Sequence, residues 1–147
     1  MTPIYDPKTY EVRRSVAYLM SRVRMALHDT MDQELDPHAI TTAQWVVILL
    51  LANGVASTSS EICHVMTCDP GAMTRMIDRL ERKGFVRRVR SPADRRSVKL
   101  ELTPEGKAVY PKILAVAIGV LNRFLRGFTK KEVRQMEEFL NRMLANG

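Results

Sequence analysis

The chain has 147 residues, of which 46% are apolar and 27% are charged. This length and composition are typical of one globular domain and exclude a disordered chain. Its net charge of +7 indicates an acidic partner, either nucleic acid or an anionic membrane surface. The longest apolar run, residues 45–52, is too short for a membrane helix, and the N-terminus lacks the pattern of a signal peptide. We therefore expect a cytoplasmic protein without a membrane partner.

The N-terminal part of the sequence predicts one long helix. It would begin at Asp6-Pro7, an N-cap followed by proline in the first helical position. Asp36-Pro37 would end the helix or its tail. Apolar residues recur between these points at helical spacing: Val12, Val16, Leu19, Met20, Val23 and Leu27.

Three shorter helices are predicted next, each from its own start signal. In a capping box, a threonine and a Gln or Glu three residues later exchange hydrogen bonds at the helix start. Thr41 with Gln44 predicts a helix through Ala52, and Thr58 with Glu61 predicts a helix to about Met66. A tight turn at Thr67 and Cys68 would follow. Asp69-Pro70 then begins a helix that ends at Lys83-Gly84.

After Gly84 the apolar period changes to that of a strand. We expect strands at residues 85–90 and 97–102, joined by a turn at residues 91–94. In the second strand, Val98, Leu100 and Leu102 are predicted to face inward. Two helices would follow, from Thr103-Pro104 to about Arg126 and from Thr129 to Leu144.

The order of these elements predicts a winged helix-turn-helix: a short helix, a tight turn, a second helix and a basic hairpin. The expected fold class is mainly α (α+β), with one domain over residues 1–147 and a two-stranded wing. Residues 40–104 would form a DNA-binding lobe, and residues 6–36 and 104–146 would be dimerisation helices. The last two helices carry wide apolar stripes, which predict a homodimer because they need a partner surface.

The second helix of this motif has a stripe of apolar residues and an opposite polar face. Residues 75–96 contain nine basic and three acidic residues, a net of +6 out of the total of +7. Such a face can lie in the major groove of double-stranded DNA, where arginine pairs with guanine edges. The candidate DNA contacts are Ser59, Pro70, Gly71, Thr74, Arg75, Asp78, Arg79, Arg88, Arg90, Asp94, Arg95 and Arg96.

Individual roles can be assigned within this set. Gly71 would let a phosphate approach backbone N–H groups at the positive end of the helix. Asp94 would hold the Arg96 side chain extended through a bidentate pair, a shape that suits a narrow minor groove. Arginines of the first strand, Arg87, Arg88 and Arg90, would reach phosphates.

Residues 40–107 resemble the MarR family of bacterial regulators. The resemblance is carried by Thr42-x-Gln44-Trp45, by the run from Met73 to Val86, by Arg88, by Ser91-Pro92-x-Asp94-Arg95-Arg96 and by Leu102-Thr103-x-Glu105-Gly106. It implies a homodimer on a pseudo-palindromic operator, with the helix from Pro70 in the major groove and Arg96 in the minor groove. It also implies repression of the chain's own gene and a neighbouring gene, and release by a small phenolic or anionic aromatic effector.

An effector site would lie where the DNA-binding lobe meets the dimerisation helices. Arg24 or His28 could pair with a carboxylate there, and Trp45 could stack on a ring. Each residue has a plainer interpretation, with Trp45 in the core, His28 solvated and Arg24 in a surface ion pair.

Cys63, His64 and Cys68 suggest two further interpretations. Their spacing does not suit a zinc pair, so we expect no metal and no cofactor. The plainer interpretation, which we favour, is that Cys63 is a small buried side chain and that Cys68 has no special role. The alternative function is a redox-responsive regulator acting through Cys63 and Cys68. The family's hydroperoxide-sensing branch keeps its reactive cysteine in the first helix, and residues 15–29 contain none.

Two other classes of protein are weighed against a DNA-binding regulator. No nucleophile elbow, phosphate loop or metal-protease helix occurs, so we predict that the chain is not an enzyme. A winged helix used only for protein–protein contact would usually lack the basic face.

Overall fold

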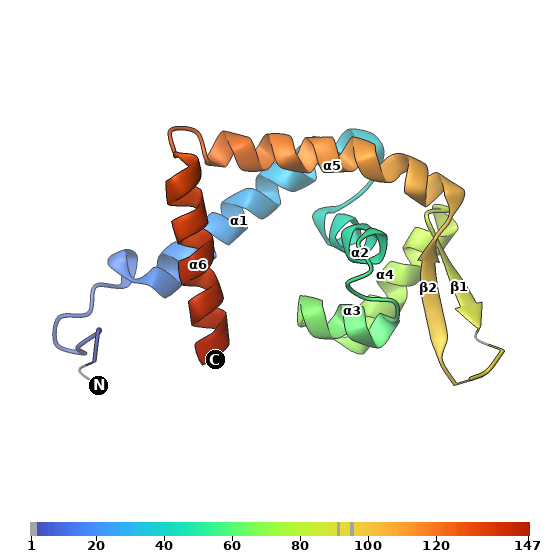
Figure 1. Cartoon of the computed structure of the whole chain (residues 1–147), viewed down its shortest axis with the longest axis horizontal. Helices are drawn as coiled ribbons and strands as arrows, with labels where there is room; N and C mark the ends of the chain where they lie inside the picture. Colours follow the sequence, from blue (N-terminus) through green and yellow to red (C-terminus); the bar gives the residue numbers. More distant parts are fainter. Residues whose placement is uncertain (1–2, 91, 95) are drawn as a thin grey trace.

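The computed structural model describes residues 3–90, 92–94 and 96–147 (Figure 1). It confirms a mainly helical fold with a two-stranded antiparallel wing. In chain order the elements are η1 (Val12–Arg14), α1 (Val16–Leu35), η2 (Asp36–His38), α2 (Thr42–Ala52), α3 (Ser59–Met66), α4 (Pro70–Arg82), β1 (Val86–Arg90), β2 (Val98–Leu102), α5 (Pro104–Phe124) and α6 (Lys130–Asn146).

Local capping fixes most of the helix starts. The capping boxes predicted at Thr41 and Thr58 are both formed, and Thr129 forms another with Glu132. The predicted start at Asp6 is wrong, because the Asp6 carboxylate accepts the Lys8 N–H (2.9 Å) in a local turn. α1 begins only at Val16, where Ser15 is the N-cap.

The hairpin pairs Val86 with Leu102 and Arg90 with Val98. Leu100 and Leu102 face the core as predicted, but Val98 is 36% exposed. The inward prediction is wrong for Val98 because it lies opposite Arg90, at the turn end of the hairpin. In the middle of β2, the Leu100 N–H donates to the Ser57 carbonyl (2.8 Å), which attaches the segment before α3 to the wing.

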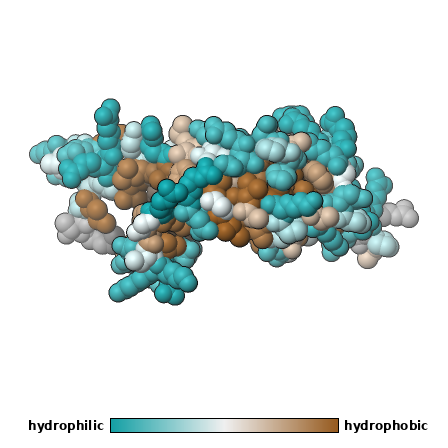
Figure 2. All heavy atoms as spheres, turned by 90° about the horizontal axis from the view of Figure 1, so that it is seen from above, coloured by the Kyte–Doolittle hydropathy of each residue, from teal (hydrophilic) through white to brown (hydrophobic). Residues whose placement is uncertain are grey.

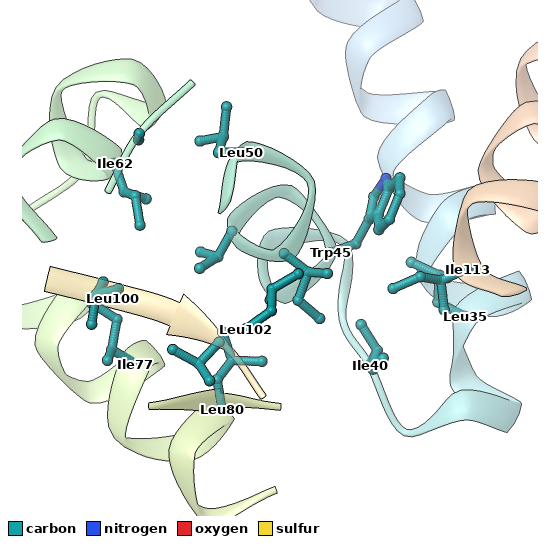
Figure 3. Close-up of a cluster of buried hydrophobic side chains, with 14 of the residues drawn as sticks. Leu35, Ile40, Trp45, Leu50, Ile62, Ile77, Leu80, Leu100, Leu102 and Ile113 are labelled. Carbon is teal, nitrogen blue, oxygen red and sulfur yellow. The ribbon is translucent and has the colours of Figure 1, made fainter. Parts of the chain in front are cut away.

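One continuous core joins the lobe of α2–α4 and the hairpin to α1 and α5. Figure 3 shows Ile77, Leu80, Leu100 and Leu102 together inside the lobe, with Leu35, Ile113 and Trp45 where α1, α5 and α2 meet. All of these side chains are nearly or completely buried.

Two close contacts join α5 to the wing. The Thr103 hydroxyl donates to the Gly84 carbonyl and also caps α5 (3.0 Å from the Gly106 N–H). A Cβ atom at Gly106 would collide with the Phe85 carbonyl oxygen. Only glycine therefore allows the first turn of α5 to lie this close to the start of the wing.

A second joint links α1 and its following loop to the lobe. The Asp32 carboxylate accepts the Thr42 N–H at 2.6 Å, which fixes the start of α2 against α1. The Lys83 ammonium, at the end of α4, donates to the Ala39 carbonyl and to the Gln44 amide oxygen (2.8 Å). The loop between α1 and α2 is thereby attached to both α2 and α4.

The helices outside the lobe leave much apolar surface uncovered. α6 has no buried residue and projects from the end of α5 (Figure 1). Apolar side chains, brown in Figure 2, lie open between hydrophilic ones on the face shown. Exposed apolar residues of the outer helices include Leu19, Val23, Leu121, Phe124, Phe139, Leu140 and Met143.

Among the described residues, no single helix is long and apolar enough to cross a membrane. Residues Val16–His38 and Thr42–Ala52 reach that length and apolarity only when they are taken together, and they are bent by 80°.

Candidate nucleic-acid interface

α4 has the two faces that the sequence predicts. Met73, Ile77 and Leu80 are buried, and Met76 is half-buried beside them. Arg75 and Arg79 project from the opposite side and are exposed. Neither pairs with an acidic side chain in the part of the chain that the structure describes. Both guanidinium groups are therefore available to an acidic partner.

The start of α4 is already capped from within the chain. Asp69 accepts the Ala72 N–H at 2.9 Å, and a Cβ atom at Gly71 would lie 3.0 Å from the same carboxylate oxygen. Gly71 thus makes room for the cap, a structural reason separate from the phosphate contact predicted for it. The Thr74 hydroxyl donates to the Pro70 carbonyl (3.0 Å), so its oxygen can still accept a hydrogen bond.

Arg88 joins the wing to α4 through two carboxylates. Its guanidinium lies 2.7 Å from Asp78 and 3.1 Å from Glu81. The hydrogen bond to Asp78 is the main cause that raises the pKa of Arg88 above its ordinary value. Arg88 and Asp78, predicted as separate DNA contacts, therefore contact each other. Glu81 was not among the predicted contacts, although its position three residues after Asp78 puts both on one face of α4.

The other two arginines of β1 differ from each other. Arg87 pairs with Glu101 across the hairpin at 3.0 Å. Arg90 is exposed, and it has no acidic partner within residues 3–90, 92–94 and 96–147. Of the three, Arg90 is the one whose charge is not already balanced by a neighbouring carboxylate.

The wing tip differs from the predicted geometry. Asp94 accepts the backbone N–H of Arg96 at 3.0 Å, and no ion pair joins the two described side chains. A carboxylate two residues earlier reaches this N–H more readily than a guanidinium at the end of a long side chain. The Arg96 side chain is exposed beside the turn. Arg95 lies outside the described residues.

A surface depression of about 700 Å³ lies between α3 and α4. It brings together three predicted contacts, Ser59, Pro70 and Thr74, from the starts of the two helices. Cys63 and Cys68 line the same depression. No group of three His, Cys, Asp or Glu side chains able to hold a metal ion occurs among the residues described.

The three predicted effector residues lie in different surroundings, with Trp45 buried and Arg24 and His28 exposed on α1. Trp45 is only 4% exposed and stacks on Tyr110 of α5, with ring centroids 5.8 Å apart. His28 is exposed and lies 3.4 Å from Asp32 on the same helix. Arg24 is also exposed. Asp32 and Tyr110 were not among the predicted residues, because the role of each depends on a contact between helices.

Comparisons with known proteins agree with this geometry. The family model described as "MarR family" matches residues 40–98. The transcriptional repressor MdtR of Bacillus subtilis is 31% identical over 130 residues, which cover 88% of this chain and 81% of MdtR.

Two solved structures extend the likeness to the fold. A mutant of MarR from Escherichia coli, complexed with operator DNA, is 30% identical, with a TM-score of 0.78 over 88% of this chain and 93% of that one. CouR from Rhodococcus jostii, bound to p-coumaroyl-CoA, has a TM-score of 0.81 over 92% and 95% of the two chains, at 23% identity. The chain belongs to the MarR family of DNA-binding transcriptional regulators.

Proposed function

We propose that the chain is a homodimeric repressor that binds a pseudo-palindromic operator and is released by a small aromatic or anionic ligand. The observation that supports DNA docking most directly is the exposed arginine face of α4. Arg75 and Arg79 carry no ion pair among the described residues, whereas Arg87 and Arg88 do. Arg75 would then read base edges, and Arg90 and Arg96 would contact phosphates and the minor groove.

The lobe of residues 40–104 would be the DNA-binding unit, and residues 6–36 and 104–146 would hold two chains together. Uncovered apolar side chains on α1, α5 and α6 support this division. In a symmetric dimer the two lobes would face successive major grooves, about 34–36 Å apart. The targets would be the chain's own gene and a neighbouring gene.

The ligand would act at the joint of α1, α2 and α5. Arg24 and His28 are exposed on α1, and Asp32 attaches that helix to the start of α2. An anion bound by either side chain would shift α1 relative to the start of α2, because Asp32 of α1 holds the two helices together. Trp45 would respond through its stacking on Tyr110 and not through direct contact with the ligand. Release would follow if the ligand favours dimers whose α4 helices no longer match one turn of DNA.

The test is fluorescence anisotropy of the full chain on the DNA upstream of its own gene, titrated with a panel of aromatic acids. Arg75→Ala should relax base preference by about 1–3 kcal/mol at one position. Arg90→Ala should lower affinity for all sequences and reduce the log–log salt slope by about 0.9. Arg126→Ala removes an equal charge from the turn after α5, outside the lobe, and should change neither the base preference nor the salt slope.

The outcomes separate the competing interpretations. Unchanged affinity and selectivity in Arg75→Ala, Arg90→Ala and Arg96→Ala would contradict the docking face. Binding without salt dependence would favour a protein-interaction module. Binding that no aromatic acid weakens would contradict the ligand part of the proposal alone.

A further inference from the structure

Two thiols lie next to each other at the end of α3, one in the helix and one in the turn that leads to α4. Cys63 is in the last turn of α3, and Cys68 follows Thr67, which has a left-handed backbone (φ 50°). The Cys68 N–H donates to the Cys63 carbonyl at 3.2 Å, which holds the two backbones close together. Their Sγ atoms are 3.5 Å apart. Because a disulfide is about 2.05 Å long, the sulfurs need to approach by only about 1.5 Å.

A small molecule can reach this pair. Both cysteines are half-buried and line the depression between α3 and α4. Its volume of about 700 Å³ lies within the usual size range of small-molecule sites. Ser59, Pro70 and Thr74 line the same depression, so a reaction at the thiols would take place on the proposed DNA-facing side.

We propose that Cys63 and Cys68 form a reversible intramolecular disulfide when they react with a low-molecular-weight disulfide, and that this bond weakens DNA binding. The Cys63 thiolate attacks the small disulfide, forms a mixed disulfide and displaces one small thiolate. The Cys68 thiolate then attacks Cys63 Sγ and displaces the second. Two electrons pass from the protein to the small disulfide, and the two protons lost by the cysteines convert both small thiolates to thiols.

The surroundings of Cys68 support this order. Burial raises the pKa of the Cys68 thiol, and neighbouring Cys63 and Asp69 raise it further. Cys68 is therefore the poorer first nucleophile. Once Cys63 is in a mixed disulfide it can no longer carry a negative charge, so its electrostatic contribution to the raised pKa disappears. Cys68 then ionises more easily, at the step where its thiolate is needed.

The bond would alter the start of α4. Cys68 directly precedes Asp69, the N-cap of that helix, and Pro70, its first residue. Drawing Cys68 Sγ toward α3 moves the segment that positions Pro70 and Thr74. The mixed disulfide would already weaken DNA binding before the internal bond forms. Its small-molecule half would fill the depression that Pro70 and Thr74 line.

The experiment treats the full chain with reduced or oxidised glutathione and follows intact mass and DNA anisotropy together. The oxidised protein should lose two hydrogens per chain and bind DNA about tenfold more weakly, with recovery on adding dithiothreitol. The Cys68→Ser variant should react only as far as the mixed disulfide, so its mass should show a single glutathione adduct. The Cys63→Ser variant should stay mostly unmodified. Both variants should keep normal DNA affinity under reducing conditions, which shows that they fold.

Three results would overturn the proposal: no change in mass, cross-links between chains in place of an internal bond, or a disulfide that leaves DNA affinity unchanged. The DNA readout rests on the proposed function. If the reduced protein bound no DNA, the proposed function and the regulatory half of this inference would both fail. The mass would still decide whether the internal bond forms.

Discussion

The lobe formed by α2–α4 and the hairpin differs from the outer helix α6 in how it uses apolar residues. In the lobe, α4 and the wing bury Ile77, Leu80 and Leu100 almost completely within one chain. In α6, Phe139 and Met143 are 50% and 47% exposed although the helix is amphipathic. The lobe therefore buries its apolar side chains in the core of the chain, whereas α6 has an apolar face without a partner in the described chain. Such a face is typical of an interface.

The first way to test this difference is to place a charge on the outer face. Phe139→Asp should weaken the proposed dimer by about a thousandfold, or about 4 kcal/mol, because a symmetric interface contains the substitution twice. Sedimentation equilibrium at micromolar concentration would show monomers. Val65→Asp on α3 is the matched control, since Val65 is also 50% exposed but lies in the lobe. A dimer that survives Phe139→Asp would show that α6 does not hold the two chains together.

The second test removes the same side chain from each region. Leu80→Ala should destabilise the protein by about 2–5 kcal/mol, because Leu80 is completely buried and its loss leaves a cavity. Leu144→Ala in α6 should cost less than about 0.5 kcal/mol, because Leu144 is 78% exposed. Urea unfolding must be measured at one protein concentration, since association contributes to stability. Equal losses in the two variants would contradict the contrast between the regions.

Local signals in the sequence were sufficient for most of the fold. The threonines at positions 41, 58 and 129 predict helix starts because each cap depends only on residues within three positions. The same reasoning failed at Asp6, because its carboxylate accepts the Lys8 N–H in a local turn and caps no helix. It also failed at Val98, because alternation along a strand does not reveal where the core ends.

The candidate site was less predictable because its pairings cross between elements. The apolar stripe of α4 follows from spacing, so the exposure of Arg75 and Arg79 follows as well. That Arg88 would lie between Asp78 and Glu81 depends on the docking of the wing against α4. The DNA and effector roles of individual residues stay predictions, since they concern molecules other than this chain.

The third test strains the joint between the two regions. Gly106→Ala should destabilise the protein by about 1–3 kcal/mol, because the new Cβ would collide with the Phe85 carbonyl oxygen. Gly119→Ala in the same helix is the matched control, since its Cβ would meet no atom within 4 Å. Removing a helical glycine there should stabilise by about 0.5–1 kcal/mol. Opposite signs in thermal unfolding would confirm the close approach, whereas a neutral Gly106→Ala would show that the joint relaxes.

The smallest expected effect concerns the other joint, where Asp32 of α1 accepts the Thr42 N–H of α2. Burial alone would raise the pKa of Asp32, but the hydrogen bonds from Thr42, together with His28, lower it below its ordinary value. A lowered pKa in the folded state means that the ionised carboxylate stabilises the fold above about pH 4, and that this contribution is lost as the pH falls further.

Asp32→Asn should therefore lower stability at pH 7 and flatten its decline between about pH 4 and pH 2. The effect should stay below about 1 kcal/mol, because the Asp32 side chain is 42% exposed and water screens it. Asp29→Asn, an exposed position on the same helix, should leave the acid dependence of urea unfolding unchanged. If the stability of Asp32→Asn declined with falling pH as steeply as that of the unaltered chain, the hydrogen bond between Asp32 and Thr42 would not couple α1 to the lobe.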